Sequence, residues 1–146
     1  MSAAKHRQVQ ACTDLSIYGE ILAFIANSGT SPLSAQEIAQ ATGISVWTVR
    51  RAMAGFRARR LVEIQSAKRT LVYTAVPGNP ALTHLKIFTT IQSLQPLVKR
   101  LRGQTHRIVL YGPCADGTDT PGSDINLFIV APEPQRVLAI TDTWRM

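Results

Sequence analysis

The sequence of 146 residues has little of three things: cysteine, charged residues and long apolar runs. Its two cysteines, Cys12 and Cys114, stand alone without metal-ligand spacing, so we expect free thiols in a reducing compartment. No apolar run approaches the roughly 20 residues of a membrane span. The basic N-terminus is not followed by the apolar core of a secretory signal. These absences predict a cytoplasmic protein with no membrane partner.

Catalytic and metal-binding signatures are also scarce. His6, His84 and His106 are far apart in the sequence and share no ligand spacing. The sequence has no nucleophile elbow and no Ser/His/Asp arrangement. The segment "GPCADG" lacks the Gly-Lys-Ser/Thr end of a P-loop. We therefore predict no resident cofactor, apart from one magnesium candidate that is considered below.

Basic residues outnumber acidic ones, 16 to 9, and they are concentrated in one part of the chain. The net charge is +7, but residues 1–103 carry 13 Lys/Arg against 4 Asp/Glu, whereas residues 104–146 carry 3 against 5. Hydrophobic residues make up 45% of the chain, which is typical of globular rather than disordered proteins. A basic first part favours binding to a polyanion such as nucleic acid. A solvated basic surface without a partner is the alternative.

Three short helices are expected in the first 60 residues. The first begins after the N-cap candidate Asp14, and the second opens with a capping box of Ser34 and Glu37. Gly43 permits a tight turn, and Ser45 then caps the third helix. The apolar stripe of the first helix is formed by Leu15, Tyr18, Ile21, Leu22 and Ile25.

A β-hairpin, a linker and a longer helix should follow. Residues 61–65 and 70–76 are rich in β-branched residues, so they predict two strands separated by the turn "SAKR". "PGNP" at 77–80 is a linker, and Pro96 should kink or split the helix that comes after it. The stripe of that helix is a core or dimer seam, and it is formed by Leu85, Phe88, Ile91, Leu94, Val98 and Leu101.

The third helix separates its apolar residues from its basic ones. At about 100° per residue, Val49, Met53 and Phe56 share one face, which should pack in the core. The opposite face would present side chains to a DNA major groove, and the hairpin tip would reach phosphates. A tryptophan near the start of such a helix is more often packed against the adjacent turn than exposed. The candidate DNA-binding residues are Trp47, Thr48, Arg50, Arg51, Arg57, Lys68 and Arg69.

Residues 14–76 resemble the winged helix-turn-helix domains of regulators of the MarR and ArsR type. The segment "SAQEIAQATGISVWTVRRAMAGFRARRLVEI" carries the resemblance, with the small Ala39, the turn glycine Gly43 and a strand directly after the third helix. The resemblance implies a transcriptional regulator that binds double-stranded DNA and forms a homodimer through a helix after the wing. Helix-turn-helix folds also bind proteins, so a protein-interaction module is an alternative.

Residues 110–130, "LYGPCADGTDTPGSDINLFIV", resemble the minimal members of the polymerase-β-like nucleotidyltransferases. Gly112 matches their phosphate-loop glycine, and Asp124 matches the first of two carboxylates that hold Mg²⁺ against a nucleoside triphosphate. Two positions depart from the pattern. Pro113 has no backbone N–H to donate to a phosphate, and Asn126 brings no charge to a cation. Asp124 could instead cap the loop. Only 20 residues follow Asn126, so the resemblance covers about the first half of that domain.

We therefore expect an α+β fold in three parts. A winged helix-turn-helix would span residues 1–76, a linker or dimerisation helix 77–103, and a partial nucleotidyltransferase-like unit 104–146. The expected function is a DNA-binding transcriptional regulator whose C-terminal unit is catalytically inactive. Gly112, Asp124 and Asn126 would keep weak nucleotide affinity, with Asp124 the one carboxylate available to a metal. A Mg²⁺-dependent nucleotidyltransferase of the antitoxin type is the enzymatic alternative.

Overall fold

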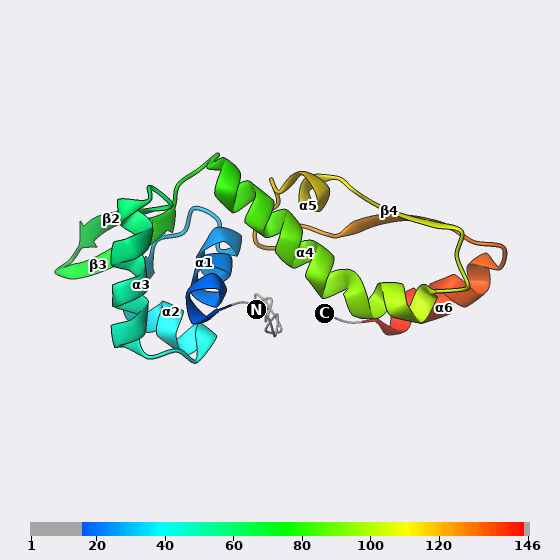
Figure 1. Ribbon diagram of the computed structural model, residues 1–146, viewed down its shortest axis with the longest axis horizontal. Coiled ribbons are helices and arrows are strands. Elements are labelled where there is room, and N and C mark those ends of the chain that lie inside the picture. The colour runs from blue at the N-terminus through cyan, green and yellow to red at the C-terminus, as the bar shows by residue number, and fades with distance from the viewer. Residues whose placement is uncertain (1–15, 145–146) are drawn as a thin grey trace.

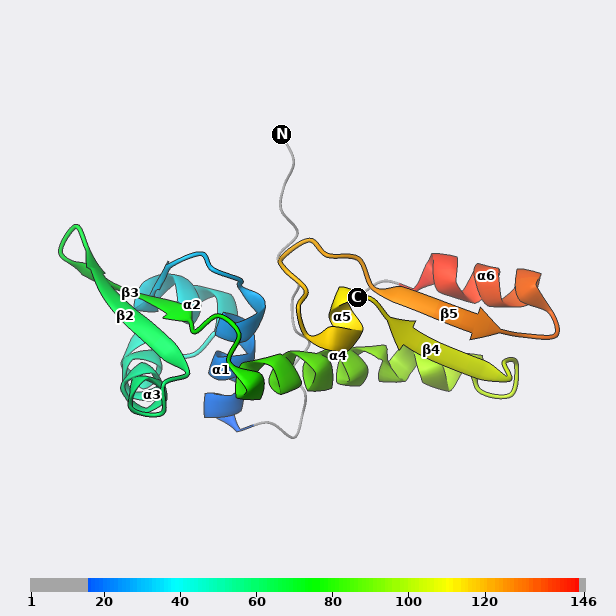
Figure 2. The same ribbon diagram turned by 90° about the horizontal axis from the view of Figure 1, so that it is seen from above.

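The computed structural model describes residues 16–144 and has the α+β fold that the sequence predicts. Three helices and a three-stranded sheet form one end of the molecule, and a two-stranded sheet with two helices forms the other (Figure 1). The long helix α4 runs between the two ends (Figure 2). The elements are α1 (Ile17–Asn27), β1 (Leu33–Ser34), α2 (Ala35–Thr42), α3 (Val46–Ala58), β2 (Val62–Ala67), β3 (Thr70–Ala75), α4 (Pro80–Leu101), β4 (Arg107–Tyr111), α5 (Pro113–Asp116), β5 (Asn126–Val130) and α6 (Pro134–Thr143).

The first end is built around the apolar faces of its three helices. Ile21 and Ile25 of α1 pack with Val49, Met53 and Phe56 of α3, and all five are buried. The core face of the third helix is therefore the predicted one. The hairpin β2–β3 closes this core, and β1 pairs with β3, so that the strand order is β1-β3-β2.

Side-chain caps fix where the helices begin. The Ser34 hydroxyl accepts the Glu37 N–H at 3.2 Å, and the Glu37 carboxylate accepts the Ser34 N–H at 2.7 Å, which confirms the capping box. The Ser34 backbone N–H thereby lowers the pKa of Glu37. Ser45 caps α3 as predicted. Ser16 caps α1 through Gly19, and the predicted cap, Asp14, lies outside the described residues.

The stripe predicted for the first helix is wrong at one described position. Tyr18 is 41% exposed, whereas Ile21 and Ile25 are buried as expected and Leu22 is partly buried. The inward face of α1 includes the two alanines Ala23 and Ala26. These small side chains let α1 approach its neighbours closely. Leu15 lies outside the described residues, as do His6 and Cys12.

The hairpin turn is tighter than the sequence suggests. β2 continues to Ala67 and β3 begins at Thr70, and these two residues are directly paired. The turn therefore consists of Lys68 and Arg69 alone, instead of the four residues 66–69. Both have positive φ, 45° and 69°, as a two-residue turn of type I′ requires.

The helix α4 differs from its prediction at its start and in its buried face, and it agrees with the prediction of a kink at Pro96. It starts at Pro80, inside the predicted linker, because the Asn79 side chain caps the Ala81 N–H at 2.9 Å. It continues through Pro96 without splitting, and its last turns change direction (Figure 1). Its predicted stripe is buried only in part: Leu94 and Leu101 are buried, whereas Phe88 and Ile91 are 41% and 43% exposed. The buried side chains are Leu82, Lys86, Thr89, Thr90, Leu94, Leu97 and Leu101.

The second end packs β4, β5 and α6 on the C-terminal half of α4. The two strands are antiparallel, with Val109 opposite Phe128 and Leu110 opposite Leu127. Alternate residues turn toward Leu97 and other apolar side chains of α4 and α6 to form a second core. The predicted loop after β4 contains one short helix, α5. Cys114 in that helix is a buried free thiol.

A buried ion pair fastens the segment between β4 and β5 to α4. The Lys86 ammonium lies 3.2 Å from the Asp119 carboxylate, and the two side chains are 11% and 3% exposed. The same ammonium donates to the Asp119 carbonyl oxygen. Two residues away, Gly117 adopts φ +69°, and a Cβ there would lie 2.5 Å from the Thr83 carbonyl oxygen of α4. The segment is thus held by charge and by close backbone contact together.

No helix within residues 16–144 is both long and apolar enough to cross a membrane.

We predict that Gly117→Ala lowers the free energy of unfolding by about 2–4 kcal/mol, because the new methyl group meets the Thr83 backbone and strains the positive φ. Gly78→Ala is the matched control, since Gly78 has φ +68° and nothing within 4 Å of its Cβ position. That variant should lose only about 1 kcal/mol. Urea unfolding of both variants measures the difference. Equal losses would contradict a steric role for Gly117.

We also predict that Lys86→Met lowers the free energy of unfolding by about 3–5 kcal/mol, because it leaves the buried Asp119 carboxylate without its cation. The double variant Lys86→Met/Asp119→Leu should recover most of that loss, since it removes the charge as well. Urea unfolding at two salt concentrations is the measurement. A single variant as stable as the unmodified chain would show that the pair does not hold the segment.

Candidate nucleic-acid interface

The outward face of α3 is basic and carries no acidic residue. Arg50, Arg51 and Arg57 are all exposed, and α3 has neither Asp nor Glu in its sequence. Within residues 16–144 the ion pairs are Lys86–Asp119 and Arg136–Glu133, so no arginine of α3 is neutralised by one of them. These guanidinium groups remain available to an anionic partner.

Trp47 and Arg51 form one surface feature on the first half of α3. Trp47 is 68% exposed, so the expectation that it packs against the adjacent turn is wrong. The Arg51 guanidinium lies 5.3 Å from the centre of the Trp47 ring, a cation–π distance between residues one turn apart. Stacking orients the guanidinium before any ligand arrives. A large exposed indole beside an oriented arginine is a surface suited to the edge of a base or to a sugar.

Thr48 is placed differently from what the sequence suggests. Its hydroxyl lies 2.8 Å from the Ser45 hydroxyl, and its backbone N–H donates to the same oxygen at 3.2 Å. Ser45 is the N-cap of α3, so Thr48 takes part in the capping of the helix. The residue is half-buried. A contact from Thr48 to DNA would have to share this hydroxyl with the cap.

Three basic residues have the backbone conformation that normally selects glycine. Among the described residues, the non-glycine residues with positive φ are Arg60, Lys68 and Arg69. Arg60 follows the C-cap of α3, where the Leu61 N–H reaches the Phe56 carbonyl at 2.9 Å in a Schellman motif. The other two form the hairpin tip. A left-handed residue with a Cβ costs about 1–2 kcal/mol, so each of these side chains is present against local preference.

Arg60 is a residue that reasoning from the sequence missed. The segment "ARRL" at the end of the third helix contains no glycine or asparagine, so a left-handed stop has to fall on an arginine. The lack of a glycine or asparagine after the helix could have indicated that an arginine adopts the left-handed conformation there. Its Cα–Cβ direction is fixed by the Schellman motif instead of by the helix. This residue joins the basic set between α3 and the hairpin.

The basic residues gather at one end of the molecule. Residues 50–69 contain seven Lys/Arg and one acidic residue, Glu63. Figure 1 shows α3 beside the β2–β3 hairpin, at the end opposite to β4, β5 and α6. Figure 2 shows the hairpin tip projecting beyond the helices. A helix and a projecting loop, both basic, can contact two separate stretches of a polyanion backbone.

The structure brings two of the three predicted nucleotide-site residues together. Asn126 begins β5 opposite Tyr111, and a Cβ on Gly112 would lie 3.0 Å from the Asn126 amide nitrogen. Asp124 is exposed, two residues before β5, and its backbone carbonyl accepts from the Cys114 thiol at 3.4 Å. The loop is closed by Ser123, whose hydroxyl accepts the Thr120 N–H at 2.9 Å.

The described residues do not assemble a cluster of metal-ligating side chains around this loop. No group of three or more His, Cys, Asp or Glu side chains within residues 16–144 could hold a metal ion. Asp119 points instead into the α4 junction, where it pairs with Lys86. Hard cations prefer several anionic oxygens, and Asp124 with the neutral Asn126 provides one. The donor set does not fit a two-magnesium nucleotidyltransferase centre.

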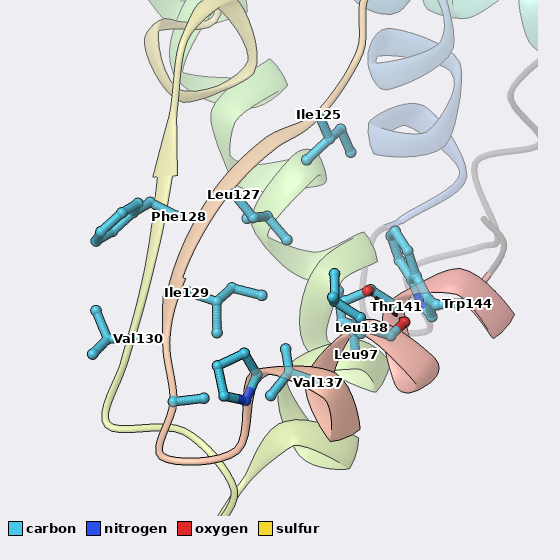
Figure 3. Close-up of a pocket in the computed structure, with 12 residues that line it drawn as sticks. Leu97, Ile125, Leu127, Phe128, Ile129, Val130, Val137, Leu138, Thr141 and Trp144 are labelled. Carbon is cyan, nitrogen blue, oxygen red and sulfur yellow. Dashed lines mark hydrogen bonds between the residues drawn. The ribbon is translucent and has the colours of Figure 1, made fainter.

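A separate apolar cavity of about 700 Å³ lies between β5 and α6 (Figure 3). Leu127 and Ile129 of β5 line one side, and Val137, Leu138 and Trp144 line the other. Most of its lining side chains are apolar, and Thr141 adds a hydroxyl group. It lies at the end of the molecule away from the basic residues and contributes nothing to an anion site.

No protein-family model and no curated sequence matches the chain. One similar solved structure is that of BpsR from Bordetella bronchiseptica, whose DNA binding is regulated by 6-hydroxynicotinic acid. It is 20% identical in sequence, and the match covers 66% of this chain and 75% of that one, with a TM-score of 0.46. A likeness this distant carries no argument about function, which has to come from the residues of this chain.

Proposed function

We propose that the protein is a transcriptional regulator that binds double-stranded DNA through a winged helix-turn-helix. In this proposal α3 is the recognition helix in the major groove, and the β2–β3 hairpin is the wing on the neighbouring backbone. Residues 1–76 would form this domain and residues 77–103 the connecting helix. Residues 104–146 would be a catalytically inactive unit, and the chain would act as a homodimer.

The observation that carries the proposal is the strain at Arg60, Lys68 and Arg69. Glycine or asparagine would adopt each left-handed backbone at lower cost. A solvated surface that needs only charge could place lysine or arginine at any of many unstrained positions. Basic residues at strained positions in a helix stop and a hairpin tip are therefore better explained by a ligand that these side chains reach.

The roles of the individual residues follow from their placement. Arg51, oriented by Trp47, would read base edges, since arginine can donate two hydrogen bonds to guanine. Arg50 and Arg57, on the side of the same helix, would contact phosphates, as would Lys68 and Arg69 at the hairpin tip. The proposal gives Thr48 a smaller part, because its hydroxyl is already used in the helix cap.

We predict that Lys68→Asn/Arg69→Gly separates stability from binding. Asn-Gly suits a type I′ turn, so the free energy of unfolding should rise by about 1 kcal/mol. Loss of two phosphate contacts should at the same time flatten the plot of log affinity against log salt by about 1.8. Thermal unfolding and fluorescence anisotropy with a mixed-sequence duplex measure the two effects.

The charge-matched control for this variant is Lys99→Gln/Arg100→Gln, which removes two exposed cations from the last turn of α4. Its salt dependence should equal that of the unmodified chain. A hairpin variant that gains stability and keeps its full DNA affinity would show that the tip is not a wing. That outcome would favour the alternative in which the domain binds another protein instead of DNA.

Arg51→Ala should weaken binding to a duplex selected by the protein by about 5- to 150-fold, because a bidentate base contact is lost. Binding to a scrambled duplex should change much less. Arg57→Ala should weaken both duplexes to the same degree and reduce the salt slope by about 0.9. Arg102→Ala, an exposed arginine after α4, is the control. Equal losses of Arg51→Ala on both duplexes would contradict base reading.

A further inference from the structure

Four apolar side chains lie on the face of the β4–β5 sheet that is turned away from α4 and α6. Val109 and Tyr111 of β4 are 37% and 52% exposed, and Phe128 and Val130 of β5 are 59% and 39% exposed. Val109 is directly opposite Phe128 in the strand register. Figure 3 shows the side chains of Phe128 and Val130 on the opposite side of β5 from Leu127 and Ile129, although both residues also border the cavity. We call these four residues the outer face.

An apolar outer face is unusual for a small antiparallel sheet. Such a sheet normally packs one face on the core and presents polar residues on the other. Here β4 and β5 are apolar on both sides, since Ile108, Leu110, Leu127 and Ile129 already pack on the second core. Two strands alone are also marginal in water. A contiguous exposed apolar patch of this kind is typical of a surface that another protein covers.

The charges at the two ends of the sheet indicate which partner covers the outer face. The exposed Arg107 lies at one end, opposite Val130, and the exposed Asp124 lies just before the other end of β5. A second copy with its strands reversed would set each Arg107 near the Asp124 of the other copy. A second copy with its strands in the same direction would set like charges together. The face is thus complementary to itself in one orientation.

The overall charge distribution favours the same occupant. Residues 104–146 carry three basic and five acidic residues, whereas the excess of basic charge is in residues 1–103. Self-association through the outer face would keep the two basic ends apart, because α3 and the hairpin are at the opposite end of each molecule (Figure 1). Electrostatic repulsion between the copies is then small.

We propose that the outer face packs against the same face of a second copy of this chain, about a twofold axis that runs across the strands. The two sheets would form a sandwich with the outer face of each copy at its centre. This inference rests on the homodimer in the proposed function and on none of the DNA contacts. It also places the dimer surface on the sheet instead of on the stripe of α4.

The size of the outer face sets the strength of the dimer. The exposed parts of its four side chains amount to roughly 400 Å² per copy. A stable interface buries about 800 Å² per partner, so the outer face alone provides about half of that area and fits a weak interface. The dimer should therefore dissociate with a constant on the order of a micromolar, and its population should change with protein concentration.

Sedimentation velocity of the full chain, from below to well above about one micromolar, tests the proposal. Phe128→Ser should raise the dissociation constant at least about tenfold. Two variants are matched controls: Leu138→Ser on α6, where the side chain is 58% exposed, and Phe88→Ser on α4, where it is 41% exposed. Both should dimerise like the unmodified chain. Circular dichroism confirms that each variant is folded.

A dimer that is lost in Leu138→Ser or Phe88→Ser, and kept in Phe128→Ser, would overturn the proposal and move the interface to the cavity rim or to α4.

Arg107→Asp and Asp124→Arg test the orientation. Each should weaken the dimer alone, and together they should restore it; no restoration would overturn the reversed arrangement. A monomer that binds DNA with a steep salt slope overturns only the dimer. A dimer without DNA affinity overturns only the proposed DNA binding.

Discussion

The buried pair of Lys86 and Asp119 is the contact on which the arrangement of the two ends depends. Lys86 belongs to α4, and Asp119 belongs to the segment that joins β4 to β5, so the pair fixes the second sheet to the helix that runs between the two ends. The same segment places Pro121 against Gly29 at the end of α1, 3.0 Å from its Cβ position. Without this ion pair, the segment would keep only the close approach of Gly117 to Thr83 and of Pro121 to Gly29, and the sheet its apolar contacts to α4 and α6. A charge buried this deeply also makes the attachment specific, because a shifted segment would leave the carboxylate without its cation.

At the basic end, strained backbone conformations lower the local stability but hold basic side chains in fixed positions. The Schellman motif at the end of α3 and the two-residue turn of the hairpin are both economical ways to reverse the chain. Each forces a positive φ on whatever residue stands there, and in this chain that residue is arginine or lysine. A short turn holds its two side chains on a rigid ladder of paired strands, where a longer loop would let them move. Strain and rigidity are therefore consequences of the same geometry, and rigidity is what a contact to a fixed phosphate spacing requires.

Local rules predicted what local interactions determine. Ser34 with Glu37, Ser45 and the Val49–Met53–Phe56 face follow from contacts within four residues, and all were found as expected. The stripe of α4 was predicted correctly at Leu94 and Leu101 but not at Phe88 and Ile91, because apolar residues occur on more than one face of this helix and only the packing of β5 and α6 decides which of them are buried. Lys86 and Asp119 are 33 residues apart, so no periodicity could connect them. Trp47 is exposed because no other helix or strand within residues 16–144 covers it, and this cannot be predicted from the local sequence. The C-terminal resemblance predicted one site of Gly112, Asp124 and Asn126. In the structure Gly112 lies beside Asn126, but among the described residues the site lacks a second carboxylate.

The two ends of the molecule differ in the forces that can act on them, and α4 keeps them separate. The basic end repels its own kind and attracts polyanions over distances set by the Debye length, about 8 Å at physiological salt. The other end carries three basic and five acidic residues over positions 104–146 and has an exposed apolar sheet face, so association at this end would depend mainly on apolar contact. If two copies join at their neutral ends, one chain's hold on DNA raises the local concentration of the second basic end, and a weak dimer suffices for tight binding to paired sites. DNA with two sites would in turn stabilise the dimer by mass action. In such an assembly a modest apolar face would be sufficient, because DNA would supply the remaining free energy of assembly.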